Sequence, residues 1–165
     1  MTRGFTLLES LLAVALLAGL TAWALPSFQY FRQDRNMARL ASGLLGYVQQ
    51  AKSMAKYRHQ DLWVHLTLLS NSSDYWALAL TNSDQAGSED LAHFSGKPYQ
   101  GITLSSTFRS DRIKIYALRG KITSGSITFY SSSQPERALK LITSYGAGRV
   151  RICAPDGEDY GYPSC

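Results

Sequence analysis

The chain has 165 residues and a formal net charge of +5, with 17 Lys or Arg against 12 Asp or Glu. Beyond a terminal segment, these residues are enough for one compact domain and not for two. The sequence contains no nucleophile motif, no phosphate-binding loop and no pair of catalytic carboxylates, and its three histidines (His59, His65 and His93) lack metal-ligand spacing. We therefore expect neither an enzyme nor a resident metal or cofactor.

The first 26 residues are the most distinctive segment. A four-residue stretch ends in Gly4, and the apolar run Phe5–Leu25 that follows holds one charged residue, Glu9. As a helix this run spans roughly 31 Å, about the hydrocarbon core of a bilayer, and it predicts a transmembrane helix over residues 5–26. A carboxylate inside a membrane is costly and usually functional. Pro26 lacks an N–H and predicts a kink where the membrane segment ends.

These positions resemble the N-terminus of the type IV pilin class, which comprises type IV pilins, minor pilins and the pseudopilins of type II secretion. The resemblance rests on Gly4, Phe5, Thr6, Leu7, Leu8, Glu9 and Pro26. It implies that residues 1–4 are a leader, that a prepilin peptidase cuts after Gly4, and that Phe5 is then methylated. It also implies that Glu9 faces the N-terminal amine of a neighbouring subunit, a cation that makes a buried carboxylate tolerable.

The class also implies a location and partners. The subunit is expected in the inner membrane as a single-pass protein with a periplasmic domain, then in an extracellular pilus, in a Gram-negative bacterium. Its partners would be major and minor pilins. A plain transmembrane anchor stays open as an alternative. A secretory signal peptide fits less well, because its cleavage site would follow the apolar run.

Residues 27–58 predict an amphipathic continuation of the helix. Its apolar face recurs at three- and four-residue steps: Met37, Leu40, Ala41, Leu44, Val48, Ala51 and Ala55. The period then changes to two, so residues 59–165 are expected to form a C-terminal β-rich globular domain. A helix packed on antiparallel sheet is an α+β architecture, and the resemblance implies the pilin fold.

Several strands are predicted within this domain. Residues 62–68 and 75–80 indicate a hairpin with a turn at 71–74, and the polar residues 82–100, with two glycines and a proline, indicate a loop. Further strands are expected over residues 102–105, 112–118, 126–130, 139–144 and 149–153.

The chain has two cysteines, Cys153 and Cys165. In a protein that reaches the periplasm, an even count predicts one disulfide. It would close a short C-terminal loop and contribute about 3 kcal/mol in the chain-entropy model. Free thiols and a metal pair are the less favoured alternatives, the latter because no further ligand sits at a suitable spacing.

Positive charge is concentrated between Arg109 and Arg151, where nine basic and two acidic residues give +7 and suggest a polyanionic partner. In a strand over 149–153, Arg149 and Arg151 would share one face, roughly 7 Å apart, and each could fork onto a phosphate. The neighbouring strand offers Lys140, with Arg137 at its start, and both could add to this patch. Lys114 and Lys121 could extend it if their strands lie alongside.

The β segments resemble the GspH/FimT-type minor pilins through GSITFYSS, ALKLITSYGAG and the ending GRVRIC. Gly148, Arg149, Val150 and Arg151 match the G-R-x-R sequence of FimT-like pilins, which implies non-specific binding of double-stranded DNA during natural transformation (competence). The glycine of the family's F-x-x-x-G stretch is absent, since FYSSSQP stands there. The resemblance therefore implies the family's fold but not the conformation of this loop.

Other interpretations remain open. Exposed arginines on an outer strand often serve only as a solvated face that blocks edge pairing. The chain could be a purely structural minor pilin that primes pilus assembly, or a type II secretion pseudopilin. The acidic tail (Asp156, Glu158 and Asp159) could cover the arginines or, less plausibly, bind calcium. Stacking of Tyr145, Tyr160 or Tyr162 on unpaired bases is another possibility.

Overall fold

The structure, a computed structural model, describes residues 6–68, 75–85, 87 and 90–165, with the side chains of residues 23–30 left aside. Gly4 and Phe5, where peptidase cleavage is expected, lie outside these residues, and so does the expected turn at 71–74. The chain divides into two compact units, Met1–Arg35 and Asn36–Cys165.

The first unit is helical. Helix α1 (Leu7–Arg58) begins in it, and its assignment continues through Pro26 without a break. Glu9 lies in the first turn and is exposed. Among the described residues, no helix combines the length and apolar character needed to cross a membrane.

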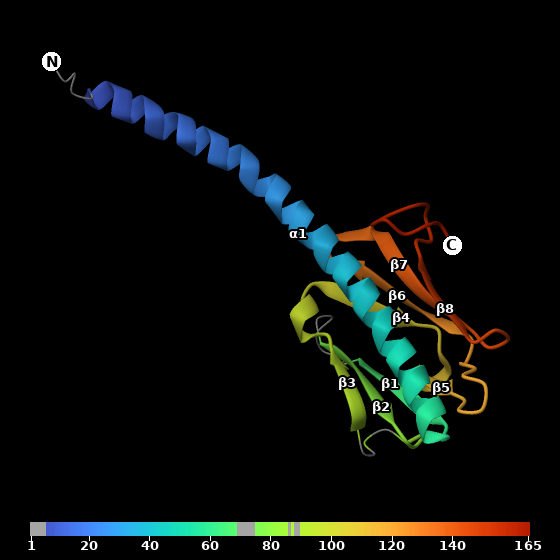
Figure 1. Ribbon diagram of the computed structural model, residues 1–165. Coiled ribbons are helices and arrows are strands. Elements are labelled where there is room, and N and C mark those ends of the chain that lie inside the picture. The colour runs from blue at the N-terminus through green and yellow to red at the C-terminus, as the bar shows by residue number, and fades with distance from the viewer. Residues whose placement is uncertain (1–5, 69–74, 86, 88–89) are drawn as a thin grey trace. The chain divides into compact units, whose positions relative to one another are not determined.

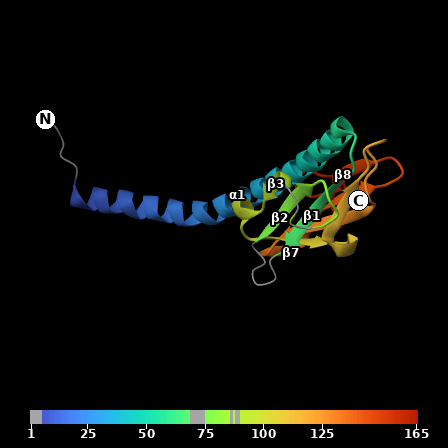
Figure 2. The ribbon, with the colours of Figure 1, turned by 90° about the horizontal axis from the view of Figure 1, so that it is seen from below.

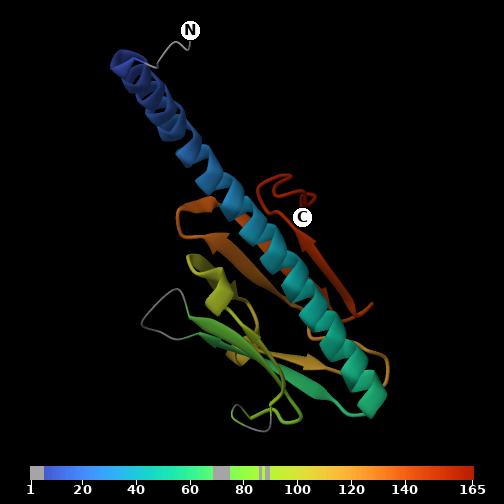
Figure 3. The same cartoon turned by 60° about the vertical axis from the view of Figure 1, so that its left-hand side comes forward.

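The second unit contains the C-terminal part of α1 and two four-stranded antiparallel sheets (Figure 1). The first sheet has the order β3-β2-β1-β5 and the second β4-β6-β7-β8. Figure 3 shows the sheets side by side, with the C-terminal segment at the end of β8. The strands are β1 (Leu62–Leu68), β2 (Trp76–Thr81), β3 (Asp90–Ser95), β4 (Ile102–Ser106), β5 (Arg112–Ile115), β6 (Gly125–Ser131), β7 (Gln134–Ser144) and β8 (Arg149–Cys153).

The core lies between α1 and the inner faces of both sheets. The helix covers one side of them (Figures 1 and 2) and contributes the apolar stripe that its spacing predicted. The buried hydrophobic residues of the described chain begin at Met37, so Asn36–Cys165 contains its own core. A fragment that holds this unit can therefore be studied as a separate domain. The predicted α+β class and the helix end near Arg58 are confirmed.

The predicted loop over residues 82–100 is wrong in part, because it contains strand β3 and a short 3-10 helix, Lys97–Tyr99. Strand β3 pairs with β2, and Phe94 packs 5.6 Å from Tyr47 and 6.1 Å from Trp76, measured between ring centroids. Tertiary packing of one aromatic residue thus overrides a polar local sequence with weak strand signal.

Two strand ends also differ from the prediction. Strand β5 ends at Ile115 rather than at residue 118, because the chain turns and the Tyr116 N–H donates to the Lys121 carbonyl at 2.8 Å. Strand β7 begins at Gln134 rather than at residue 139. The remaining strands agree with the expected ranges within one residue at each end.

Candidate functional site

The candidate site is the outer face of the β7–β8 hairpin. In β8, Val150 is half-buried and Ile152 is buried, whereas Arg149 and Arg151 are exposed. The alternation follows from the two-residue period of a strand and agrees with the sequence prediction. Strand β8 is the last in its sheet, so the two guanidinium groups stand at the sheet's edge.

Lys140 shares the face of the two arginines. Arg151 lies opposite Ile142 in the register, and Lys140 is two residues further along β7, opposite Cys153. Diagonal neighbours of this kind have Cα atoms roughly 7–8 Å apart, within reach of long side chains. Lys140 is half-buried. In the part of the chain that the structure describes, no Asp or Glu side chain makes an ion pair with Arg149, Arg151 or Lys140.

Gly148 positions the start of β8 through its backbone. Its φ is +57°, and a Cβ atom added there would lie 2.6 Å from the Gly120 carbonyl oxygen. The Gly148 carbonyl accepts a hydrogen bond of 2.5 Å from Lys52 Nζ of α1. Burial, followed by repulsion from Lys56, lowers the pKa of Lys52. Gly148 therefore fixes the hairpin against the helix and the Gly120 turn, which places Arg149.

Arg137 does not join this surface, contrary to the expectation. Its Nε and Nη2 donate to the two carboxylate oxygens of Asp159 at 2.9 and 2.6 Å, and its Nη1 donates to Gln134 Oε1 at 3.0 Å. The guanidinium also lies 4.2 Å from the ring centroid of Tyr160. The hydrogen bond from Arg137 lowers the pKa of Asp159. Arg137 thus anchors the C-terminal segment, and we remove it from the candidate surface.

The C-terminal segment is held by the Cys153–Cys165 disulfide that the cysteine count predicted. Backbone hydrogen bonds of 2.9 Å join Ala154 to Pro163 and to Cys165. The segment reaches Arg151, whose Nη2 donates to the Cys165 carbonyl at 3.2 Å, but Arg151 stays exposed. The acidic tail therefore places Asp159 on Arg137, and both arginines of β8 stay exposed to solvent. Within the described residues, no group of three or more metal-ligating side chains comes together.

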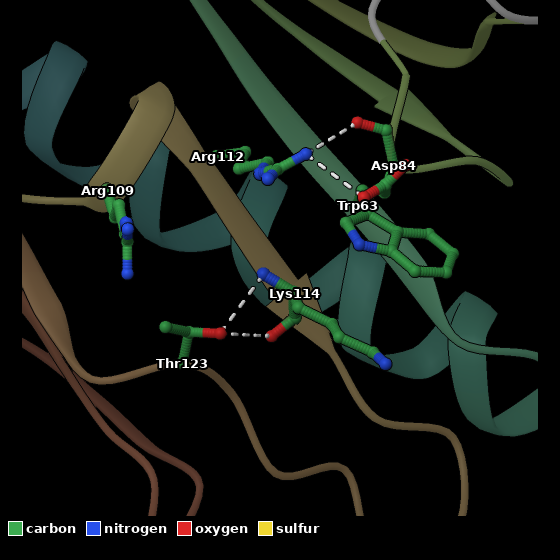
Figure 4. Close-up of a pocket in the computed structure, with 6 residues that line it drawn as sticks. All are labelled: Trp63, Asp84, Arg109, Arg112, Lys114 and Thr123. Carbon is green, nitrogen blue, oxygen red and sulfur yellow. Dashed lines mark hydrogen bonds and ion pairs between the residues drawn. The ribbon is translucent and has the colours of Figure 1, made fainter.

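The first sheet carries a second basic region, a cavity of about 310 Å³ (Figure 4). Here Arg112 Nη1 lies 3.1 Å from Asp84 Oδ2. Lys114 Nζ lies 3.0 Å from an oxygen of Asp61, and a backbone hydrogen bond from Ala117 and the contact with Lys114 lower the pKa of Asp61. The cavity is lined by Trp63, Asp84, Arg109, Arg112, Lys114 and Thr123.

Lys121 lies near the β7–β8 turn, a position from which it could extend the basic patch of Arg149 and Arg151. Its Nζ is 4.5 Å from the ring centroid of Tyr145, the residue after β7. Tyr116 meets Tyr145 edge to face at 5.5 Å. The sequence analysis missed Trp63, Tyr116 and Arg109. The alternating pattern of their strands predicts that Trp63 and Lys114 face outward. The sequence does not show that they are neighbours, because only the β1–β5 register places Trp63 opposite Lys114.

Together, a long N-terminal helix on two antiparallel sheets and a disulfide-closed C-terminal segment define a protein of the pilin class. The family described as Type II transport protein GspH matches residues 40–161, and the chain belongs to this family. Membership of this family makes it a minor pilin or pseudopilin, a non-enzymatic subunit of the kind that assembles with other pilins. The family implies residence in the inner membrane before assembly.

Solved structures share the fold. The type IV minor pilin FimU of Pseudomonas aeruginosa matches in two crystal forms. The first has a TM-score of 0.60 at 16% identity and covers 81% of this chain and 96% of FimU. The second has a TM-score of 0.54 at 18% identity and covers 74% and 93%. The minor pseudopilin EpsH of the Vibrio cholerae type 2 secretion system has a TM-score of 0.52 at 13% identity and covers 72% and 98%. No curated protein matches the sequence.

Proposed function

We propose that this chain is a minor type IV pilin that binds double-stranded DNA without sequence preference, through the outer face of β8, during DNA uptake. The observation that carries the proposal is the placement of Arg149 and Arg151. Both are exposed on one face of an edge strand, and neither forms an ion pair with an Asp or Glu side chain among the described residues. Lys140 adds a third cation to that face.

The chemistry of this surface suits phosphates rather than bases. A guanidinium can donate two parallel hydrogen bonds to a phosphate, and roughly 7 Å of strand separates the two groups. Such contacts release counterions from DNA, so affinity falls steeply with salt and carries no sequence information. Within the described residues α1 is the sole α-helix, and its C-terminal part is packed into the core, so no recognition helix is free for a groove.

The N-terminal residues support a processing and assembly role in the same proposal. Cleavage after Gly4 would leave Phe5 with a free cationic amine, and Glu9 of one subunit would pair with that amine of the next. Glu9 is exposed in the first turn of α1, where a neighbouring subunit can reach it. A Glu9→Gln variant should lose incorporation into fibres while its globular domain stays folded. Unchanged incorporation, measured on sheared and purified fibres, would contradict this pairing.

The DNA-binding proposal is tested with a fragment of residues 30–165, titrated against random-sequence duplex DNA at two salt concentrations. The wild type should bind and weaken with salt. The double variant Arg149→Ala/Arg151→Ala should lose most of the affinity and reduce the salt slope by about one per phosphate contact removed. The matched control is Arg39→Ala/Lys97→Ala, which removes the same charge from exposed positions on α1 and the 3-10 helix.

The control separates a specific surface from general charge. If both double variants weaken binding equally, net charge and not β8 attracts DNA. If the wild type does not bind at low salt, the proposal fails. The second candidate, a type II secretion pseudopilin, would then take first place, because the family description and the likeness to EpsH favour it.

A further inference from the structure

A continuous row of rings and cations runs from β1 and β5 of the first sheet to the residue that follows β7 of the second sheet. We name it the aromatic–basic strip, and it consists of Trp63, Lys114, Tyr116, Tyr145 and Lys121. Lys114 Nζ lies 5.2 Å from the ring centroid of Trp63 and 4.8 Å from that of Tyr116. Tyr116 contacts Tyr145 edge to face at 5.5 Å, and Lys121 Nζ lies 4.5 Å from the Tyr145 ring centroid.

The rings of the strip differ from the other aromatic group of the domain. Tyr47, Trp76, Phe94 and Tyr99 stack around the core, and Trp76 is 3% exposed. In the strip, by contrast, Trp63 and Tyr116 are half-buried and Tyr145 is 44% exposed. Core packing therefore does not account for the strip, whose rings keep surface available to a ligand.

Cavities flank the strip at both ends. One of about 310 Å³ adjoins Trp63 and Lys114, with Arg109 across it on a separate turn (Figure 4). The next two residues of that turn, Ser110 and Asp111, both have positive φ, of +57° and +48°. Such backbone strain in non-glycine residues is typical of functional segments. The other cavity, of about 240 Å³, is lined by Tyr116, Leu118, Arg119, Lys121 and Tyr145.

The strip also leads to the surface proposed above for DNA. Tyr145 follows Ser144, which lies opposite Arg149 in the β7–β8 register. Arg109, Arg119 and Lys121 make no ion pair within the described residues, so cations remain for phosphates along this path. Exposed rings interleaved with cations are the arrangement that binds single strands, because every unpaired base offers a face for stacking. A duplex keeps its bases stacked inside and cannot use these rings.

We propose that the aromatic–basic strip binds a single-stranded segment of DNA, with unpaired bases on Trp63 and Tyr145. The phosphates would lie on Lys121 and on Arg119, which lines the adjoining cavity. The inference rests on the proposed function in taking DNA as the partner. It adds a second site that distinguishes a frayed or unwound strand from the duplex held by Arg149 and Arg151.

The test uses the fragment of residues 30–165 and a single-stranded oligodeoxythymidine of about 15 nucleotides. This fragment lacks Trp23 and keeps Trp63 and the buried Trp76, whose Nε1 donates to the Ile102 carbonyl at 3.0 Å. Quenching of tryptophan fluorescence on binding therefore reports on Trp63. The variant Tyr145→Leu should weaken single-strand affinity about fivefold or more, the loss of one stacked base, and leave duplex affinity unchanged.

Two further variants keep the test sharp. Tyr145→Phe retains the ring and should bind the single strand like the wild type. Tyr75→Leu removes an exposed tyrosine that precedes β2, at the end of the β1–β2 pair away from Trp63. This variant should also bind the single strand like the wild type. Binding without fluorescence quenching, or equal single-strand affinity of Tyr145→Leu and the wild type, would overturn the strip.

The experiments can refute either proposal while the other one stands. If duplex binding depends on Arg149 and Arg151 but the oligodeoxythymidine does not quench Trp63, the strip is refuted and the proposed function stands. If the arginine variant binds duplex like the wild type while Tyr145→Leu loses the single strand, the β8 proposal is refuted and the strip stands. A thermal melt of each variant shows that the comparison is made on folded protein.

Discussion

Replacing Gly148 with alanine tests how the candidate site is held in place. An L-residue at a φ of +57° costs about 1–2 kcal/mol. The new Cβ would lie 2.6 Å from the Gly120 carbonyl oxygen, a backbone atom that cannot rotate away, and relieving such overpacking costs about 1–3 kcal/mol. The alanine also restricts the unfolded chain, which offsets about 0.4–1 kcal/mol. The net expectation is a loss of about 1–5 kcal/mol.

The assay is urea and thermal unfolding of the fragment of residues 30–165. A loss of that size should lower the melting temperature by roughly 10 °C. Gly146 provides the matched control, because it lies in the same turn, has no positive φ of this kind, and has no atom within 4 Å of an added Cβ. Gly146→Ala should change stability by about 0.5 kcal/mol or less.

The DNA-binding readout extends this test. In folded Gly148→Ala, relief of the overlap must move the start of β8, so Arg149 should be displaced and duplex affinity should fall. If Gly148→Ala is as stable as Gly146→Ala, the packing of Gly148 on Gly120 does not hold the hairpin and the reasoning is refuted.

Three further predictions concern the C-terminal segment. Because Arg137 lowers the pKa of Asp159, the ionised carboxylate stabilises the fold by about 1 kcal/mol above its ordinary pKa, and this gain is lost as the pH falls through the folded value. The difference in unfolding free energy between wild type and Asp159→Asn should therefore reach its full size above about pH 5 and shrink as the pH falls below 3.8. A difference in urea unfolding that stays constant with pH would contradict this. Arg137→Ala should lower the melting temperature but leave the salt slope of DNA binding unchanged, and a reduced slope would return Arg137 to the DNA surface. Reduction of the Cys153–Cys165 disulfide, with a sequence separation of 12, should cost about 3 kcal/mol, measured as a lower urea midpoint than in the oxidised protein.

Local pattern was sufficient for part of the candidate site. A strand alternates its side chains with a period of two, so the order Arg149, Val150, Arg151, Ile152 places both arginines on one face whatever the sheet contains. The same logic located the core stripe of α1, where apolar residues recur at helical spacing. The role of Gly148 was not available from the sequence, because its partner Gly120 belongs to another turn.

Partners distant in sequence account for what the sequence analysis got wrong. Arg137 looked like a neighbour of Lys140 on one strand, but Asp159, 22 residues further along the chain, takes its guanidinium. Strand β3 forms in a polar segment because Phe94 packs on Tyr47 of the helix and on Trp76 of β2. Neither contact produces a periodic pattern in the sequence from which it could be predicted.

The sequence by itself determined the class of this protein, its helix, the faces of its strands and the candidate disulfide, because these depend on local periodicity and on a motif of contiguous residues. Only the tertiary structure decided which cations are free and which are paired, and how rings from separate strands form one strip. Those properties depend on strand register and on side chains that meet across the fold, and register is set by packing of the whole core rather than by any one segment.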